Sequence, residues 1–296
     1  MSQNTKRQII GFRSGRLTLT QPTEQEQAAL NLVTERLIRI SEGSMSLVFS
    51  SIDPPVGGSR LDQATNTDLR EAYDFAGHLL YAAEDHLRTI LMIIRSGTIP
   101  SYAPYTLLRP AAEAEVRARH LLDLGISETD RLGRGLNERW DNLIEQRKAG
   151  VDAEAIRSRV RHLERRAKAN GVAVKLSKPK AGKSRVLVGF GENLDSDLEL
   201  FKLHLRAGST AFRFLSAHVH SKPWVQLPKS HARPGRTTSM SSISTEINLV
   251  VFASVLDSVL KLHDENVGFL FVLAGYPLRV WNDFKARSIP FLEQPA

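Results

Sequence analysis

Helical spacing decides the fold class, and it is clearest in the stretch Ala211-Phe212-Arg213-Phe214-Leu215-Ser216-Ala217-His218-Val219-His220-Ser221-Lys222-Pro223-Trp224, an apolar helix ended by proline. At roughly 100° per residue, Arg213 and His220 differ by about 20° around the axis, whereas His218 lies about 140° from Arg213. Arg213, Ser216 and His220 therefore share a face. An arginine keeps its charge and an imidazole titrates near neutrality, so this face suits phosphodiester chemistry.

Composition indicates a soluble globular protein. The chain has 296 residues, of which 42% are hydrophobic, and can bury a large core. Its apolar runs are shorter than the roughly 20 residues that span a bilayer, and no apolar signal-peptide segment follows the N-terminus. We therefore expect a cytoplasmic protein with no membrane contact. The absence of cysteine excludes disulfides, zinc–thiolate sites and iron–sulfur clusters.

Apolar residues at three-to-four spacing recur along the chain and predict a mainly α protein, a helical bundle. We expect a first helix from Pro22 to Gly43 and a long core helix from a cap at Asn66 or Thr67 to Arg95. Further helices are expected at about 100–124, 127–150, 152–170, 193–205 and 244–264, with a last one from 276. The expected organisation is an N-terminal arm and first helix at 1–60, then a bundle domain at 61–290 with a basic insertion at about 152–190.

Two short alternating runs, 172–176 and 185–190, predict a β-hairpin within that insertion. The hairpin tip contains Gly182-Lys183-Ser184, but the first glycine of a phosphate-binding loop is missing and a strand follows, so we reject that motif. The segment 229–242 is rich in Ser, Thr, Pro, Gly and Arg and is expected to be an exposed loop.

The positive charge is concentrated in one segment. The net charge is +8, and the segment from Arg157 to Arg185 alone carries a charge of +10. Such a segment can follow a phosphate backbone without reading sequence. Alternatively, it is a solvated helix face followed by a loop, and it contains no aromatic residue for base stacking. The candidate nucleic-acid-binding residues are Arg157, Arg161, Arg165, Arg166, Lys168, Lys178, Lys180 and Lys183.

Two other pairs of ionisable residues are candidates for a catalytic or metal-binding role. Arg109 and Glu113 are four residues apart, so they can pair on one face of a helix, and a structural salt bridge is the simplest interpretation. Pro110, beside them, fits only the first turn or a kink. His78 and His86 lie eight residues apart, but no metal-binding pattern accompanies them, so no metal or other cofactor is predicted.

Three motifs resemble the HEPN superfamily of helical proteins, in particular uncharacterised actinobacterial members. They are Tyr105-Thr106-Leu107-Leu108-Arg109 followed by Glu113, the run Arg134 to Arg139, and the Phe212 to Ser221 pattern with its arginine and histidines. The resemblance covers about residues 65–285. It implies a helical bundle, and in many members a metal-independent endoribonuclease marked by arginine, four to six residues, then histidine.

The resemblance implies a specific mechanism. His220, or else His218, would be the general base that activates a ribose 2′-hydroxyl, and Arg213 would stabilise the charge on phosphate. Ser216, Arg109 and Glu113 would orient these groups. It also implies a homodimer and an antitoxin or effector partner, in phage defence or a toxin–antitoxin system. The alternative is an inactive member that binds nucleic acid or a protein through the basic segment.

Overall fold

The computed structural model describes residues 7–13, 16–42, 48, 50–178, 186–192, 196–206, 208–222 and 247–287. The fold is mainly α-helical, as predicted, with ten helices among these residues and two small sheets. The predicted loop at 229–242 and the hairpin tip with Lys180 and Lys183 lie outside the described residues.

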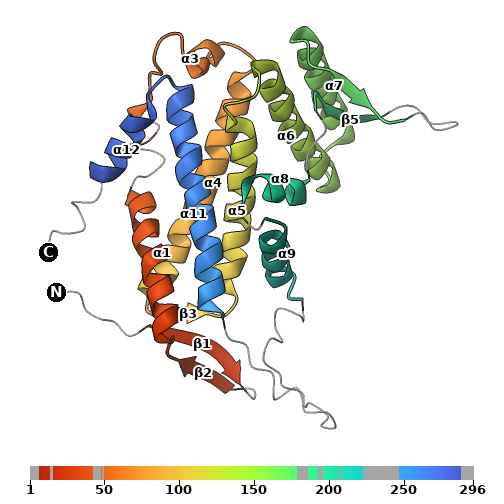
Figure 1. The fold of residues 1–296 in the computed structure, drawn as a ribbon. Coiled ribbons are helices and arrows are strands. Elements are labelled where there is room, and N and C mark those ends of the chain that lie inside the picture. The colour runs from red at the N-terminus through yellow and green to blue at the C-terminus, as the bar shows by residue number, and fades with distance from the viewer. Residues whose placement is uncertain are drawn as a thin grey trace.

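Four long helices stand side by side and form the bundle (Figure 1). They are α1 (Glu24–Glu42), α4 (Arg70–Arg95), α5 (Ala103–Leu122) and α11 (Leu249–Leu273). Each turns an apolar stripe inward, and fully buried residues such as Leu37, Ile90, Leu108 and Phe252 fill the centre. Helix α1, grouped with the N-terminal arm by sequence, thus packs within the bundle.

Short elements close the two ends of the bundle (Figure 1). At one end, β1 (Gln8–Arg13) pairs antiparallel with β2 (Arg16–Thr20) and parallel with β3 (Thr98–Pro100). At the other end lie α3 (Arg60–Ala64) and α12 (Leu278–Arg287), and Trp281 of α12 is buried against Phe271.

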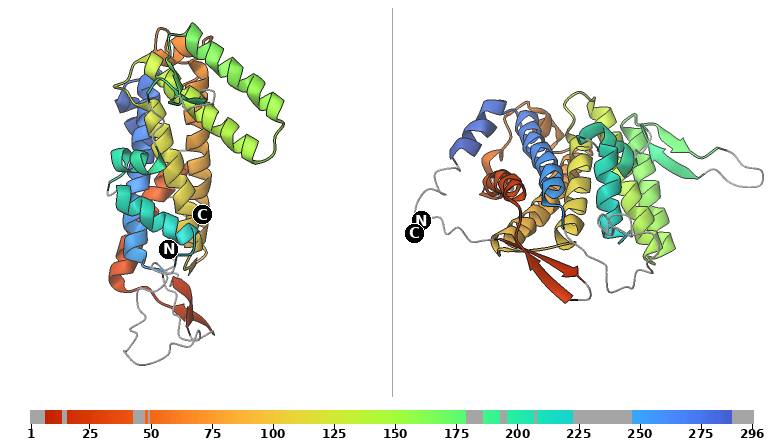
Figure 2. Two further views of the ribbon diagram at one scale, coloured as in Figure 1. Left: turned by 90° about the vertical axis from the view of Figure 1, so that its right-hand side faces the viewer. Right: turned by 60° about the horizontal axis from the view of Figure 1, so that its bottom comes forward.

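Helices α6 (Glu128–Lys148) and α7 (Ala153–Ala169) form a hairpin that projects from the bundle (Figure 2). The predicted β-hairpin follows it, with β4 (Val174–Leu176) antiparallel to β5 (Leu187–Phe190). Asn137 fixes β5 to α6, because its side-chain amide donates to the Phe190 carbonyl at 2.9 Å and accepts from the Phe190 amide at 2.8 Å. Finally, α8 (Asp197–His204) and α9 (Gly208–Val219) pack on α5.

Two expected helix boundaries are wrong. Helix α4 is capped by Leu69, not by Asn66 or Thr67, because Thr67 closes a local turn by donating its hydroxyl proton to the Ala64 carbonyl. Helix α11 does not end at Asp264 but runs to Leu273, since Asn266 is buried and hydrogen-bonded to α5.

Pro110 lies in the interior of α5, which continues across it. Proline removes the amide that would bond to the Thr106 carbonyl. Thr106 is exposed, so solvent can satisfy that carbonyl, and the helix is not forced to end there.

Candidate functional site

Helix α9 carries the predicted Arg213–His220 face on the surface. Arg213 and His220 are exposed and Ser216 is half-buried. The helical bonding continues to the His220 amide, which donates to the Ser216 carbonyl at 3.0 Å, and Ser221 then turns the chain with a positive φ of 49°. Neither the Arg213 nor the His220 side chain has a hydrogen-bond or ion-pair partner among the described residues. Within the described chain, both side chains are therefore available to a ligand.

His218, the other predicted base, points into the protein and is only 6% exposed. Its Nδ1 donates to the Phe214 carbonyl at 2.9 Å, and its ring stacks on Tyr105 with 4.0 Å between centroids. Burial lowers the pKa of His218, which keeps it neutral at pH 7. These contacts give His218 a packing role and separate it from Arg213.

Arg109 and Glu113 form the predicted ion pair, with 2.9 Å between Arg109 Nε and the carboxylate. Arg109 also donates to the Phe212 carbonyl at 2.8 Å, and its guanidinium carbon lies 3.9 Å from the centre of the Phe212 ring. The side chain is buried between α5 and α9. Arg109 thus fixes the backbone next to Arg213 and points away from solvent.

The basic segment divides into committed and uncommitted cations. Arg166 is committed, because it binds Asp68 at 2.8 Å and also Glu71 of α4. Arg157 and Arg161 both contact Glu154 at the surface. In contrast, the exposed side chains of Arg165, Lys168 and Lys178 have no hydrogen-bond or ion-pair partner within the described parts of the chain.

A cationic groove of about 570 Å³ lies between α6 and α7. We define it by its charged and ionisable lining residues, which are Arg139, Arg159, His162, Arg165, Arg166 and the single carboxylate Glu71. Arg139 contacts Glu71 at 3.1 Å, and Arg159 donates to Gln146 at 2.7 Å. Four guanidinium groups facing one groove produce a positive potential that attracts polyanions.

Sequence reasoning did not name Arg139, Arg159 or His162 of this groove as ligand-binding residues, although Arg159 lies in the basic segment. The sequence pattern that could have indicated them is their helical spacing. Positions 139, 143 and 146 lie on one face of α6, and positions 159, 162 and 166 lie on one face of α7. Only the packing of α6 against α7 shows that these two faces meet.

A second groove, of about 600 Å³, lies on the other flank of α7. We name it the Trp140 groove. Most of its lining residues are apolar: Trp140, Leu143, Ile144, Ala153, Ile156, Val160, Val186 and Leu187. Its charged lining residues are Arg147, Arg157, Arg161 and Glu164. The basic segment lacks an aromatic residue, but the fold brings Trp140 from α6 beside it.

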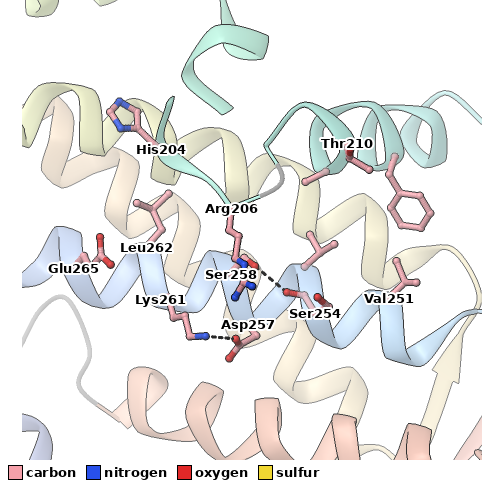
Figure 3. Close-up of a pocket in the computed structure, with 13 residues that line it drawn as sticks. His204, Arg206, Thr210, Val251, Ser254, Asp257, Ser258, Lys261, Leu262 and Glu265 are labelled. Atoms are coloured by element: carbon pink, nitrogen blue, oxygen red, sulfur yellow. Dashed lines mark hydrogen bonds and ion pairs between the residues drawn. The ribbon is translucent and has the colours of Figure 1, made fainter. Parts of the chain in front are cut away.

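A third pocket, of about 580 Å³, lies between the α8–α9 connection and α11 (Figure 3). Arg206 extends over α11 towards Ser258, and Lys261 pairs with Asp257 at 2.7 Å. Burial lowers the pKa of His204, which lines this pocket, to about 4. Two cations, Arg206 and Lys261, and two carboxylates, Asp257 and Glu265, line this pocket, so its lining has no net charge, unlike the cationic groove.

The bundle core contains a buried polar cluster that sequence spacing did not indicate. Glu115 of α5 accepts hydrogen bonds from His263 Nδ1 and Asn266 Nδ2 of α11, both at 2.7 Å. All three residues are at most 2% exposed. Burial alone would lower the pKa of His263, but the carboxylate of Glu115 raises it above its ordinary value. The cluster links two bundle helices and has no access to a ligand.

Comparison with protein-family models, curated proteins and solved structures finds no match to this chain. Across the described residues, no helix is long and apolar enough to cross a membrane. Nor do those residues contain a group of three or more histidine or carboxylate side chains placed to hold a metal ion, and His78 is exposed on α4.

Proposed function

We propose that this protein binds RNA through the face formed by α6 and α7. The observation that carries the proposal is the cationic groove, where two helices place four arginines and one histidine around a single carboxylate. Of these four, Arg165 is exposed and has no hydrogen-bond or ion-pair partner in the described chain, and Lys168 adds one further exposed cation of the same kind. RNA is the nucleic acid that the resemblance to HEPN proteins implies.

The physical basis of binding is counterion release. Each cation that neutralises a phosphate releases a condensed counterion, so affinity falls with salt, with a slope of about −0.7 per contact for a single strand. Arg165 and Lys168 can contribute without breaking an existing ion pair. Arg166 holds α7 to α4 and is better left intact in any experiment.

The test measures binding of a labelled RNA oligonucleotide by fluorescence anisotropy at several salt concentrations. The variant Arg165→Gln/Lys168→Gln removes two cations from the α7 face, and the control Arg95→Gln/Arg279→Gln removes two exposed cations from α4 and α12. The first should weaken binding and reduce the slope of log K against log salt by about 1.4. Equal effects of the two variants, or no salt-dependent binding by the unmodified protein, would refute the proposal.

A second candidate function, cleavage of the bound RNA, is favoured by Arg213 and His220, which are exposed on α9 and have no partner among the residues that the structure describes. In this mechanism His220 takes the proton of a ribose 2′-hydroxyl, and the 2′-oxygen attacks the adjacent phosphorus to form a 2′,3′-cyclic phosphate. The bond from phosphorus to the 5′-oxygen breaks, and the 5′-oxygen takes a proton from solvent water. Arg213 stabilises the negative charge on the phosphate oxygens.

Incubation with RNA in EDTA separates the two functions. Cyclic-phosphate ends that disappear in His220→Ala but persist in His218→Gln would support cleavage. Intact RNA at a protein concentration that saturates binding would leave binding alone as the function.

A further inference from the structure

Helix α7 separates two grooves of different chemistry. At roughly 100° per residue, positions 157, 160, 161 and 164 face one flank, and positions 158, 159, 162 and 166 face the other. The first flank is the Trp140 groove and the second is the cationic groove. The solvent-facing crest between them carries the exposed Arg165 and Lys168, and Arg157 and Arg161 at the edge of the Trp140 groove pair with Glu154. A chain of phosphates can follow this crest while other groups of the same ligand enter a flanking groove.

The Trp140 groove has an aromatic and aliphatic lining, which suits a flat apolar group. Trp140 and Ile144 are one turn apart on α6, and both are half-buried. Val160 of α7 lines the same space, and Val186, just before β5, remains 60% exposed. The volume of about 600 Å³ falls within the range of small-molecule pockets.

The charges around this groove select the kind of ligand. Arg147, Arg157 and Arg161 line it against one acid, Glu164, and Glu154 pairs with two of these arginines. Three arginines against two carboxylates leave one net positive charge, so an apolar group attached to negative charge is favoured. A nucleobase in a polynucleotide has this combination, and bases stack readily on indole rings and on arginine planes.

We infer that the Trp140 groove takes an unpaired nucleobase, so that the protein selects single-stranded over double-stranded RNA. This inference rests on the proposed function and specifies its ligand. In a duplex the bases are stacked and paired inside the helix and cannot reach Trp140, which leaves only phosphate contacts. A single strand gains both the phosphate contacts on the crest and the stacking contact.

The experiment compares three probes: a single-stranded RNA, a duplex of the same length, and inorganic polyphosphate, which has phosphates but no bases. Each is titrated against the unmodified protein, Trp140→Leu and Trp140→Phe. Trp140→Leu should weaken single-stranded RNA binding roughly five- to 150-fold, the loss expected for one stacked base. It should leave duplex and polyphosphate binding unchanged. Trp140→Phe keeps an aromatic face and should retain most of the affinity.

The outcomes separate the inference from the proposed function. If polyphosphate and RNA bind but Trp140→Leu has no effect, or if duplex binds as tightly as the single strand, the inference is overturned and the proposed function stands. If Trp140→Leu weakens all three probes equally, the groove has collapsed and the inference is also overturned. If no probe binds, the proposed function fails. Binding of an acidic amphipathic peptide that needs Trp140, with RNA indifferent to it, would assign the groove to a protein partner.

Discussion

Replacing Glu115 with glutamine should destabilise the protein strongly and change how its stability depends on pH. Glu115 and Asn266 are completely buried and His263 is 2% exposed, so the carboxylate is the main charge facing the imidazole, with Glu84 and Asp264 further contributing. Glutamine keeps the shape of the side chain and one hydrogen-bond acceptor. It removes the charge that raises the His263 pKa.

The magnitude follows from the cost of a buried unpaired charge. Removing one partner of a buried ion pair typically costs about 3–5 kcal/mol, a large part of the roughly 5–15 kcal/mol that stabilises a domain. The folded-state pKa of His263 is raised above its unfolded value of about 6.5. Its contribution is therefore fully present below pH 6.5 and is lost as pH rises through the folded-state pKa. The gap between unmodified protein and variant should be widest near pH 6 and narrower at pH 8.5.

Urea unfolding followed by circular dichroism at pH 6 and pH 8.5 gives both free energies. The matched control is Glu154→Gln, the same substitution at an exposed carboxylate paired with Arg157 and Arg161, which should have little effect. A Glu115→Gln loss no larger than that of the control would refute the reasoning. A difference in unfolding free energy between the unmodified protein and Glu115→Gln that grows with rising pH would also refute it, because Glu115 stabilises the charged form of His263, which is populated at low pH.

Three other predictions concern the fold. Burial, with Arg134 nearby, lowers the pKa of His120 to about 3, so its contribution to stability is complete above pH 6.5 and declines below it. The unmodified protein should lose about 2 kcal/mol of this contribution at pH 5. The urea midpoint of His120→Gln should therefore fall less between pH 7 and pH 5 than that of the unmodified protein. Gly135→Ala should destabilise the protein by about 1–3 kcal/mol and so lower its melting temperature, since the new Cβ would lie 2.8 Å from the Ala72 Cβ. An unchanged or higher melting temperature would contradict this. Arg109→Gln should cost about 2–3 kcal/mol in urea unfolding and speed amide exchange in α9, whereas lost RNA cleavage at unchanged stability would give Arg109 a direct role in the reaction.

The sequence predicted most helices because their apolar stripes are local signals, but it could not predict where long-range partners extend or shorten them. Asp264, Glu265 and Asn266 form a polar run that favours a helix end at that point. In the structure α11 continues, since Asn266 finds its partner in Glu115, 151 residues earlier in the chain. Periodicity within a single segment contains no information about such a pairing.

The candidate site was predictable to the same extent. Local charge density singled out α7, and i, i+4 spacing identified the Arg109–Glu113 pair. Trp140 and Arg139 lie beside α7 only because α6 and α7 form a hairpin. Arg166 is bound by Asp68, 98 residues earlier and just before α4, and by Glu71 of α4. A list of cations therefore indicates a charged region without showing which of them are available to a ligand.

The candidate ligand-binding arginines differ in whether their guanidinium groups already have a partner in the protein. A ligand phosphate that recruits Arg109 must displace the half-buried carboxylate of Glu113 and leave the Phe212 carbonyl unpaired, at a cost that the new contact has to exceed. A phosphate that meets Arg165 or Arg213 displaces only water and counterions, because neither side chain has another partner among the described residues. The proposed functions therefore depend on the uncommitted cations of α7 and α9, while Arg166 holds α7 and Arg109 holds α9 in place.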